Sequence, residues 1–596
     1  MDAPIFGGAA YTVLMCSALC GAPLSLVLLW LYRRAVIRNM SRRAETGSDL
    51  DGAAAASSPT PGPAAAITHI NRRDTPDPRD AGATARSIQA RAPEFVFADL
   101  AGAARGSAAG DLSGRLRWYP CQAALIYLLG GLAFAFVLSL ISLIDYWPVV
   151  SPIYSFLFLL SLHLWPAVLV VNLVGAATRR GALTLAAAYF IAYTLLGVPN
   201  AFHQGTVSAL WGTTWWTWIV SALLPTVLLL GFLAPRARAV GPLVFTFLAF
   251  VFLGWNLLVL LDGVEGPLGP PMVALVEAGL PAGLIVTLFE LLGVFLMTGL
   301  GCLALLVLRG LYLARWVNDQ SLLADSIFLI FAINASIDLS FDGAWLLLSG
   351  AAGFMAYKFV TWIGLALWRQ VRLRRARKVP QLLLLRVFSL GKRSEALYRD
   401  IARAWRYVGN LCFISGPDLA AATVEPHRFL DYLSGRLNRN FIDSRETLER
   451  RMVGMQRVPD LEGRFRAQDY FCYEDTWKMV LRRLAAGSDA VLMDLRGFTP
   501  KNAGCIFEIQ ELVQHVDLER VTFVIDSTTD EPFLRQSVEE AWGRLEAESP
   551  NHGHALQVRL FRLRGPSTGL GTGSGDVQKL LNELAGSVGP APAPLA

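Results

Sequence analysis

Charged residues are scarce in this sequence, since Asp, Glu, Lys and Arg together occupy only 17% of its 596 positions, against about 25% in soluble domains. Its seven cysteines are dispersed, without a Cys-x-x-Cys pair and without zinc-ligand spacing. That pattern argues against a disulfide framework and against a structural metal site. The net charge of +6 is modest and lies largely beside apolar segments, so we expect no nucleic-acid partner.

Hydrophobic residues, in contrast, make up 54% of the chain, and the mean hydropathy is +0.43. They are concentrated in blocks that could cross a lipid bilayer, and these predict a multi-pass membrane protein with about nine helices of roughly 20 residues each. The block at 322–337 is short and contains or adjoins Asp325 and Asp338, so a re-entrant segment is the alternative there. The blocks lie at residues 9–31, 121–144, 152–175, 182–198, 213–233, 241–261, 283–308, 322–337 and 343–368.

The positions of the arginines predict the orientation in the membrane. No basic residue precedes the first block, whereas Arg33, Arg34 and Arg38 follow it, which is typical of an uncleaved anchor with its amino terminus outside. The last block ends in the basic run WRQVRLRRARK, which predicts a cytoplasmic carboxyl-terminal domain. Lysine supplies only six of the 53 basic residues, and Ala and Gly are abundant. This composition suggests a bacterial genome rich in GC, and hence the bacterial inner membrane.

Composition divides the chain into five parts. Residues 44–116 are rich in Ala, Pro, Gly and Ser, which predicts a disordered cytoplasmic linker in which only the apolar piece at 94–100 docks transiently. The glycine run after residue 565 lacks the Lys-Ser/Thr ending of a phosphate-binding loop. The predicted parts are an anchor at 1–43, the linker at 44–116, a helical bundle at 117–379, an α/β domain at 380–564 and a flexible tail at 565–596.

Two ionisable residues fall within the predicted membrane helices, Glu290 and Lys358. Such groups are functional candidates because a charge is costly in a bilayer, and together they would form a proton or ion path. The simpler interpretation, which we favour, is a single buried pair or side chains that reach the membrane surface. The chain also shows no clear two-fold repeat of the kind found in many transporters.

In the cytoplasmic half, strand patterns alternate with helical patterns, which predicts a mostly parallel, doubly wound sheet. The stretch at 488–513 predicts a strand at 490–495, a polar loop and a helix from residue 505. Ligands of open α/β sheets bind beyond the carboxyl ends of the strands. Asp494, Arg496, Asn502 and Glu508 are therefore candidate site residues.

Three segments carry a resemblance to a known family: LLLLRVFSLGKRSEALYRDIARAW, TWKMVLRRLAAGSDAVLMDL and NAGCIFEI. They resemble TIR domains, and the last one also resembles nucleoside 2-deoxyribosyltransferase-like proteins. The resemblance implies that Glu508 is the catalytic residue and that NAD or a nucleotide is the substrate or ligand. It covers the α/β domain only. The sequence departs from the TIR pattern at Gly504, where Trp is usual, and carries extra residues before Thr476.

The chemistry of the stretch agrees with such a reaction, because a carboxylate can stabilise or attack the oxocarbenium-like state of a breaking glycosidic bond. Glu508 shares a helix face with apolar neighbours, so we expect it to be paired or to have a raised pKa. A structural acid near a helix start is the alternative. Asp494 would orient a ribose hydroxyl and Arg496 a phosphate, unless they form a structural ion pair. Phe498 would stack on a base, and Asn502 is better explained as a helix cap.

Two further places could line the same pocket. Arg393 and Ser394 begin a predicted helix, where phosphate can bind, although a plain helix cap is the simpler explanation. Asp526 follows the next strand along the chain, and turn chemistry explains it equally well.

Three functions are consistent with these features. The first is a membrane protein whose TIR-like domain binds a nucleotide and cleaves NAD or a nucleoside through Glu508. The second is a catalytically silent sensor, or a scaffold that forms homo-oligomers through the cytoplasmic domain. The third is a transporter or channel that depends on Glu290.

Overall fold

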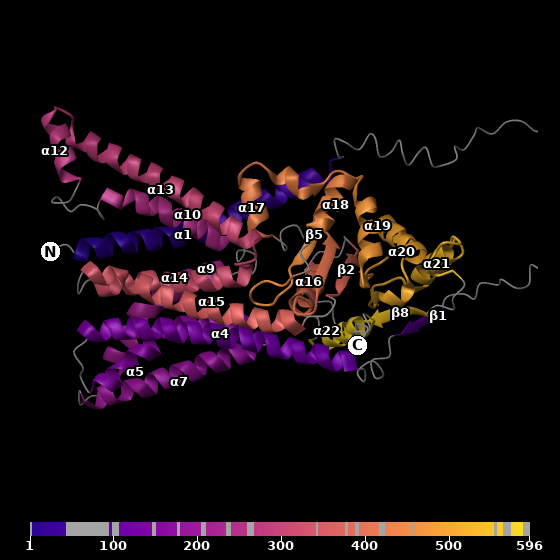
Figure 1. The fold of residues 1–596 in the computed structure, drawn as a ribbon, viewed down its shortest axis with the longest axis horizontal. Coiled ribbons are helices and arrows are strands. Elements are labelled where there is room, and N and C mark those ends of the chain that lie inside the picture. Colours follow the sequence, from indigo (N-terminus) through magenta and orange to yellow (C-terminus); the bar gives the residue numbers. More distant parts are fainter. Residues whose placement is uncertain are drawn as a thin grey trace, which may run out of the picture.

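The computed structural model shows a bundle of long helices with an α/β domain at one end, and the amino terminus lies at the opposite end of the bundle (Figure 1). It describes residues 3–42, 94–97, 107–145, 151–175, 179–203, 210–233, 240–258, 268–340, 344–375, 379–387, 392–416, 424–454, 458–552, 557–563 and 574–587.

Each of the nine predicted apolar blocks is largely helical. Six helices are long and apolar enough to cross a membrane, and a seventh span results if α5 and α6, which are bent by 42° at Leu164, count as one. The block at 322–337 lies within one of the six. The bundle helices are α1 (Ala3–Met40), α4 (Ser107–Asp145), α5 (Pro152–His163), α6 (Trp165–Gly175), α7 (Arg179–His203), α8 (Trp216–Trp218), α9 (Leu224–Leu233), α10 (Gly241–Trp255), α12 (Gly269–Glu277), α13 (Ala282–Leu313), α14 (Asp319–Ser340) and α15 (Ser349–Arg375).

The sequence predicts about nine crossings, whereas six or seven spans among the described residues are long and apolar enough to cross a membrane. Two of the blocks are shorter apolar helices, at Trp216–Leu229 and Gly241–Trp255. The first of these follows a π-helical turn at Leu210–Trp215 and is interrupted by another at Ile219–Leu223, so a continuous α-helix of spanning length does not form there. The hydropathy of the sequence gives no warning of this break.

The surface of the bundle is apolar, whereas its interior is closely packed. On α13, Phe295 is 75% exposed, and an apolar surface of this kind suits lipid rather than water. Inside, the rings of Phe328 and Tyr357 stack with 3.9 Å between their centroids. A Cβ atom at Gly131 would lie 2.3 Å from that of Ala167. Small residues therefore let α4 and α6 approach closely, as in other membrane bundles.

The α/β domain is built on an eight-stranded sheet in which every strand pair is parallel, in the order β1-β8-β7-β6-β2-β3-β5-β4. The prediction of a mostly parallel, doubly wound sheet is confirmed. Without β1, β4 and β5 the order is that of the 2-1-3-4-5 class of doubly wound sheets. The strands are β1 (Glu94–Phe97), β2 (Gln381–Arg386), β3 (Asn410–Ile414), β4 (Phe441–Ile442), β5 (Ala467–Cys472), β6 (Ala490–Asp494), β7 (Val521–Ile525) and β8 (Gln557–Arg562).

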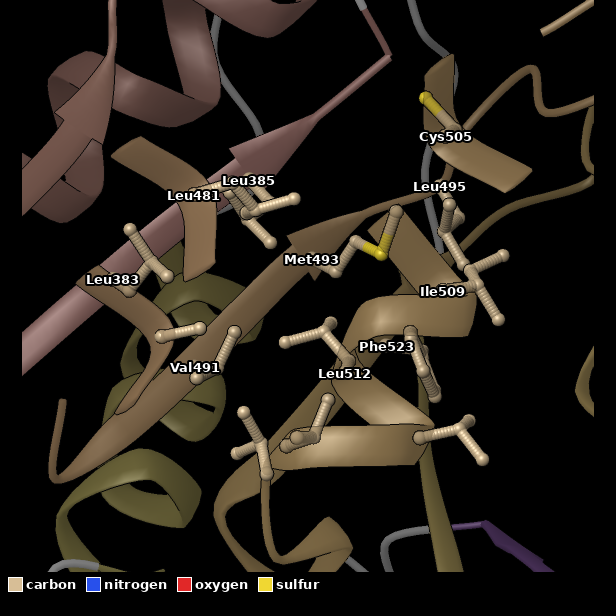
Figure 2. Close-up of a cluster of buried hydrophobic side chains, with 14 of the residues drawn as sticks. Leu383, Leu385, Leu481, Val491, Met493, Leu495, Cys505, Ile509, Leu512 and Phe523 are labelled. Atoms are coloured by element: carbon tan, nitrogen blue, oxygen red, sulfur yellow. The ribbon is translucent and has the colours of Figure 1, made fainter. Parts of the chain in front are cut away.

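Both faces of the sheet are covered by helices, so the central strands are apolar on both sides. On one face, α19 (Trp477–Gly487), α20 (Ala503–His515) and α21 (Glu531–Trp542) pack on the sheet. Figure 2 shows this core, in which side chains from β2 and β6 meet those of α19 and α20. On the other face lie α16 (Lys392–Trp405) and α22 (Ser574–Ser587).

Two predicted boundaries are corrected. The linker prediction at 44–116 includes β1, which pairs with β8 from Glu94 to Phe97, and the first turns of α4. The rest of it, at 44–93 and 98–106, lies outside the described residues. The tail predicted at 565–596 includes α22, whose Leu580 and Leu584 are fully buried in the core. The α/β domain therefore takes strands and helices from both flanks.

An insertion between β3 and α19 attaches this domain to the bundle. It contains α17 (Pro426–Leu433), a 3₁₀ turn (Leu437–Asn440), β4, α18 (Arg445–Val453) and β5. Phe429 and Phe471 of the insertion share one buried cluster with Tyr32 of α1 and Val244 of α10.

Candidate functional site

The carboxyl ends of β2 and β6 lie side by side, because Arg386 pairs in register with Asp494. This is the point where the strand order reverses: the chain leaves β2 toward β3 on one side and later returns to β6 on the other. Open α/β sheets bind their ligands in the crevice at such a switch point. The loop after β6 begins with a tight turn, in which Gly497 has a φ of 69° that favours glycine.

Glu508 lies on α20, the helix that follows this loop, and its side chain is only 2% exposed. Among the described residues, its Oε2 atom has no hydrogen-bond partner. Burial raises the pKa of Glu508 to about 8, against a smaller opposing effect of the Arg386 guanidinium. The carboxyl group is therefore largely protonated and neutral near pH 7. The expectation of a raised pKa agrees with this result.

Asp494 and Arg496 form an ion pair that is almost completely buried, with exposures of 1% and 4%. The Arg496 Nε and Nη2 atoms donate to the two carboxylate oxygens of Asp494 at 2.8 and 2.7 Å. Each carboxylate oxygen thus accepts from the guanidinium. This geometry is that of a structural ion pair, the alternative to contacts with a ribose and a phosphate. The pair closes the turn after β6.

Cys505 lies one helical turn before Glu508 and is 3% exposed. Its Sγ atom lies 3.9 Å from the Arg386 carbonyl oxygen. Burial, and then the charges of Glu508 and Asp494, raise the pKa of this thiol. A thiol in this environment stays protonated and is a poor nucleophile.

Other predicted site residues have local structural contacts. Phe498 is fully buried and stacks on Phe533 at 5.5 Å between centroids, so its ring is not open to a base. The Asp526 Oδ1 atom accepts from the Thr528 backbone N–H at 2.9 Å, which is a turn contact. Arg393 and Ser394 lie in the first turn of α16, and their side chains lie outside the described residues.

Asn502 stabilises the loop rather than capping the helix through its side chain. Its Oδ1 atom accepts from the Thr499 backbone N–H at 2.9 Å and from the Thr499 hydroxyl at 3.0 Å, and no side-chain cap bond forms. The predicted helix cap is thus corrected, because the acceptor is already used by the preceding turn. The Asn502 backbone carbonyl still accepts from the Ile506 N–H.

We expect Asn502→Ala to lower the free energy of unfolding by about 1 kcal/mol, because two hydrogen bonds of the loop are lost. Urea unfolding of the full-length protein, followed by tryptophan fluorescence, would measure this change. Thr499→Val removes the hydroxyl contact alone and should cost less. An equal loss in both variants would show that the Thr499 backbone bond contributes little.

The two predicted membrane residues do not pair with each other. Lys358 instead forms an ion pair with Asp325 of α14, at 2.8 Å from Nζ to Oδ2, and the Tyr357 hydroxyl donates to the other Asp325 oxygen. The described residues give Glu290 no hydrogen bond or ion pair. The proposed Glu290–Lys358 path is therefore corrected: α15 packs beside α14, whereas α13 packs against α10.

Sequence reasoning missed Arg386, because its position at the end of the apolar run LLLL suggests only a strand terminus. It also missed the charged residues of the insertion, whose partners lie on distant bundle helices. Comparisons with protein-family models, with curated proteins and with solved structures find no match.

Proposed function

We propose that this chain is a membrane protein whose α/β domain binds a nucleoside or nucleotide at the switch point between β2 and β6 and hydrolyses its N-glycosidic bond. The observation that supports the proposal is Glu508, a buried, protonated carboxyl group with an unpartnered oxygen at that place. Strongly perturbed acids in such a position are candidates for catalysis. The TIR-like resemblance supports the same residue.

The protonation state of Glu508 favours one class of leaving group. In hydrolysis of a nucleoside, the bond from C1′ to the base nitrogen breaks, the base takes a proton and water adds to C1′. A protonated Glu508 would supply that proton as a general acid and regain one from the attacking water. The nicotinamide ring of NAD is already cationic and leaves without protonation. A nucleoside or nucleotide is therefore the better substrate class than NAD. Because Glu508 is 2% exposed, neighbouring side chains must move before it contacts a substrate.

The cellular orientation is part of the proposal. The amino terminus and the α/β domain lie at opposite ends of the bundle (Figure 1), as an odd number of crossings requires. Together with the basic flanks, this favours a cytoplasmic α/β domain in a bacterial inner membrane.

The experiment uses the full-length protein in nanodiscs, incubated with NAD and with a panel of nucleosides and nucleotides, and follows release of free base by chromatography. We expect release by the wild type and by Glu511→Gln, which changes another acid of α20, but not by Glu508→Gln. Release that survives Glu508→Gln would assign the chemistry elsewhere. No release from any substrate would overturn catalysis.

The second candidate is a non-catalytic sensor or self-association scaffold. Two observations favour it. The Glu508 carboxyl group is buried, and the insertion joins the domain to the bundle. In that case the same panel would change the oligomeric state of wild type and Glu508→Gln alike, without base release. Nothing in the described residues favours a transporter dependent on Glu290.

A further inference from the structure

A cavity of about 700 Å³ lies where the bundle meets the insertion. Leu313, the last residue of α13, and Arg315 line it on the bundle side. On the domain side it is lined by α17, α18 and the start of β5. Its volume falls within the range of small-molecule sites, about 300–1,000 Å³. It is distinct from the switch point, since Glu508 and Asp494 are not among its lining residues.

The lining of this cavity is strongly basic. It includes three acids, Glu425, Asp443 and Asp469. Burial lowers the pKa of His427 to about 3, so this ring adds no charge near neutral pH. Six arginines against three acids leave a formal excess of three positive charges. The six arginines are Arg315, Arg428, Arg439, Arg450, Arg451 and Arg466.

Two of the acids are already engaged by a single arginine. Arg428 contacts the Glu425 carboxylate at 3.1 Å and forms a close ion pair with Asp469, and the Arg428 side chain is only 7% exposed. The third acid, Asp443, accepts from the Ser444 hydroxyl at 3.1 Å. With three acids against six arginines, the carboxylates of the cavity cannot balance all of its positive charges.

Arg451 gives the most direct indication that this cavity suits an anion. Its Nη1 atom is buried and has no hydrogen-bond partner among the described residues. Burial, and then the neighbouring Arg428 charge, lower the pKa of this guanidinium. A buried cationic donor without an acceptor is costly. A bound anion would both accept from Nη1 and offset the like charges.

We propose that this cavity binds a ligand bearing phosphate groups, with Arg451 and Arg450 of α18 as its principal contacts. Guanidinium groups match phosphate oxygens in geometry and charge. The excess of three positive charges suits a diphosphate or a similarly charged ligand. Because Leu313 ends a candidate membrane span, the ligand comes either from an anionic lipid headgroup or from a soluble phosphate compound.

The experiment uses the full-length protein in two kinds of nanodisc. In phosphatidylcholine nanodiscs, pyrophosphate is titrated and followed by calorimetry. In nanodiscs containing phosphatidylglycerol, the number of retained anionic lipids is measured by native mass spectrometry. The variants are Arg451→Met and Arg450→Gln, of which the second changes an exposed side chain and should fold normally. Arg520→Gln, an exposed arginine outside the cavity, removes the same charge and serves as the control.

We expect Arg451→Met to weaken binding about tenfold or more, as loss of a charge-assisted hydrogen bond predicts, Arg450→Gln to weaken it less, and the control to stay within about twofold. A weakened pyrophosphate titration identifies a soluble ligand, and reduced lipid retention identifies a headgroup. The proposal would be overturned if neither probe binds, or if all variants bind equally. Base release at Glu508 is a separate measurement and does not decide this one.

Discussion

Glu508→Gln is expected to remove a marked pH dependence from the stability of the α/β domain and to make the domain more stable than wild type at pH 8. The pKa of Glu508 is about 8 in the folded state, against an ordinary value of 4.5. Between these values the folded protein binds one more proton than the unfolded chain. Stability therefore falls as the pH rises from about 4.5 to about 8, by up to about 1.4 kcal/mol per pH unit.

The slope disappears outside that window, because both states are protonated below it and both are ionised above it. Over the whole window the loss is of the order of 4 kcal/mol. Glutamine cannot titrate, so the variant should match wild type near pH 4.5 and exceed it at pH 8. Urea unfolding of the full-length protein in nanodiscs across pH 4.5–8 measures the difference.

The matched control is Glu511→Gln, a neighbouring acid of α20 whose carboxylate pairs with Arg482. It should keep the slope that Glu508 produces. The same slope in Glu508→Gln as in wild type would contradict the neutral, buried carboxyl group on which the proposed hydrolysis depends. A carboxyl group that lowers stability at neutral pH, and whose removal stabilises the fold, is what a functional site would show.

The β6-to-α20 segment was largely predictable from local pattern. A buried strand that ends in Asp494, breakers at Gly497 and Pro500, and helical spacing from Cys505 are all local signals, and the observed bounds differ from the predicted ones by one or two residues. The raised pKa of Glu508 also followed from its apolar neighbours on the helix. The opposing charge of Arg386 did not, because the pairing of β2 with β6 joins residues more than 100 positions apart.

The places of two elements at the flanks were missed for a related reason. The four residues of β1 make a strand only because β8 offers a free edge, and nothing local in a segment rich in Ala and Pro indicates that edge. In α22, Val577, Leu580 and Leu584 show the spacing of an apolar helix face, so the helix itself was predictable. Its place between the sheet and α4 depends on tertiary packing.

Partners in ion pairs between distant segments could not be predicted from local sequence either. Lys358 was matched with Glu290 because both are rare charges in apolar blocks. Which helices are neighbours decides the true partner, and α14 brings Asp325 within 2.8 Å. Similarly, Glu462 and Arg464 look like ordinary surface charges of a polar loop. In the structure Glu462 is fully buried and accepts from the Tyr127 hydroxyl of α4 at 2.5 Å.

Arg464→Met is expected to destabilise this junction by about 3–5 kcal/mol, because it leaves the buried Glu462 carboxylate without its counter-charge. In wild type the Arg464 Nη1 atom lies 3.0 Å from Glu462 Oε2 and 2.6 Å from the Gln320 oxygen of α14. Burial raises the pKa of Glu462, and the Arg464 charge opposes that effect. Without Arg464, Glu462 can escape the cost only by taking up a proton.

Protonation of Glu462 makes the stability loss of the variant depend on pH. A raised pKa of Glu462 in the variant means that the extra stability loss grows as the pH rises and shrinks as the pH falls toward 4.5. Urea unfolding at pH 5 and at pH 8, together with hydrogen exchange of residues 458–466, would measure both the size and the slope.

Adding Glu462→Gln to the variant should recover much of the loss, since the unpaired charge is then absent. Arg535→Met removes a partly exposed ion pair with Glu531 and should cost less than about 1 kcal/mol. An equal cost for Arg464→Met and Arg535→Met would show that the junction loop does not hold the α/β domain against the bundle.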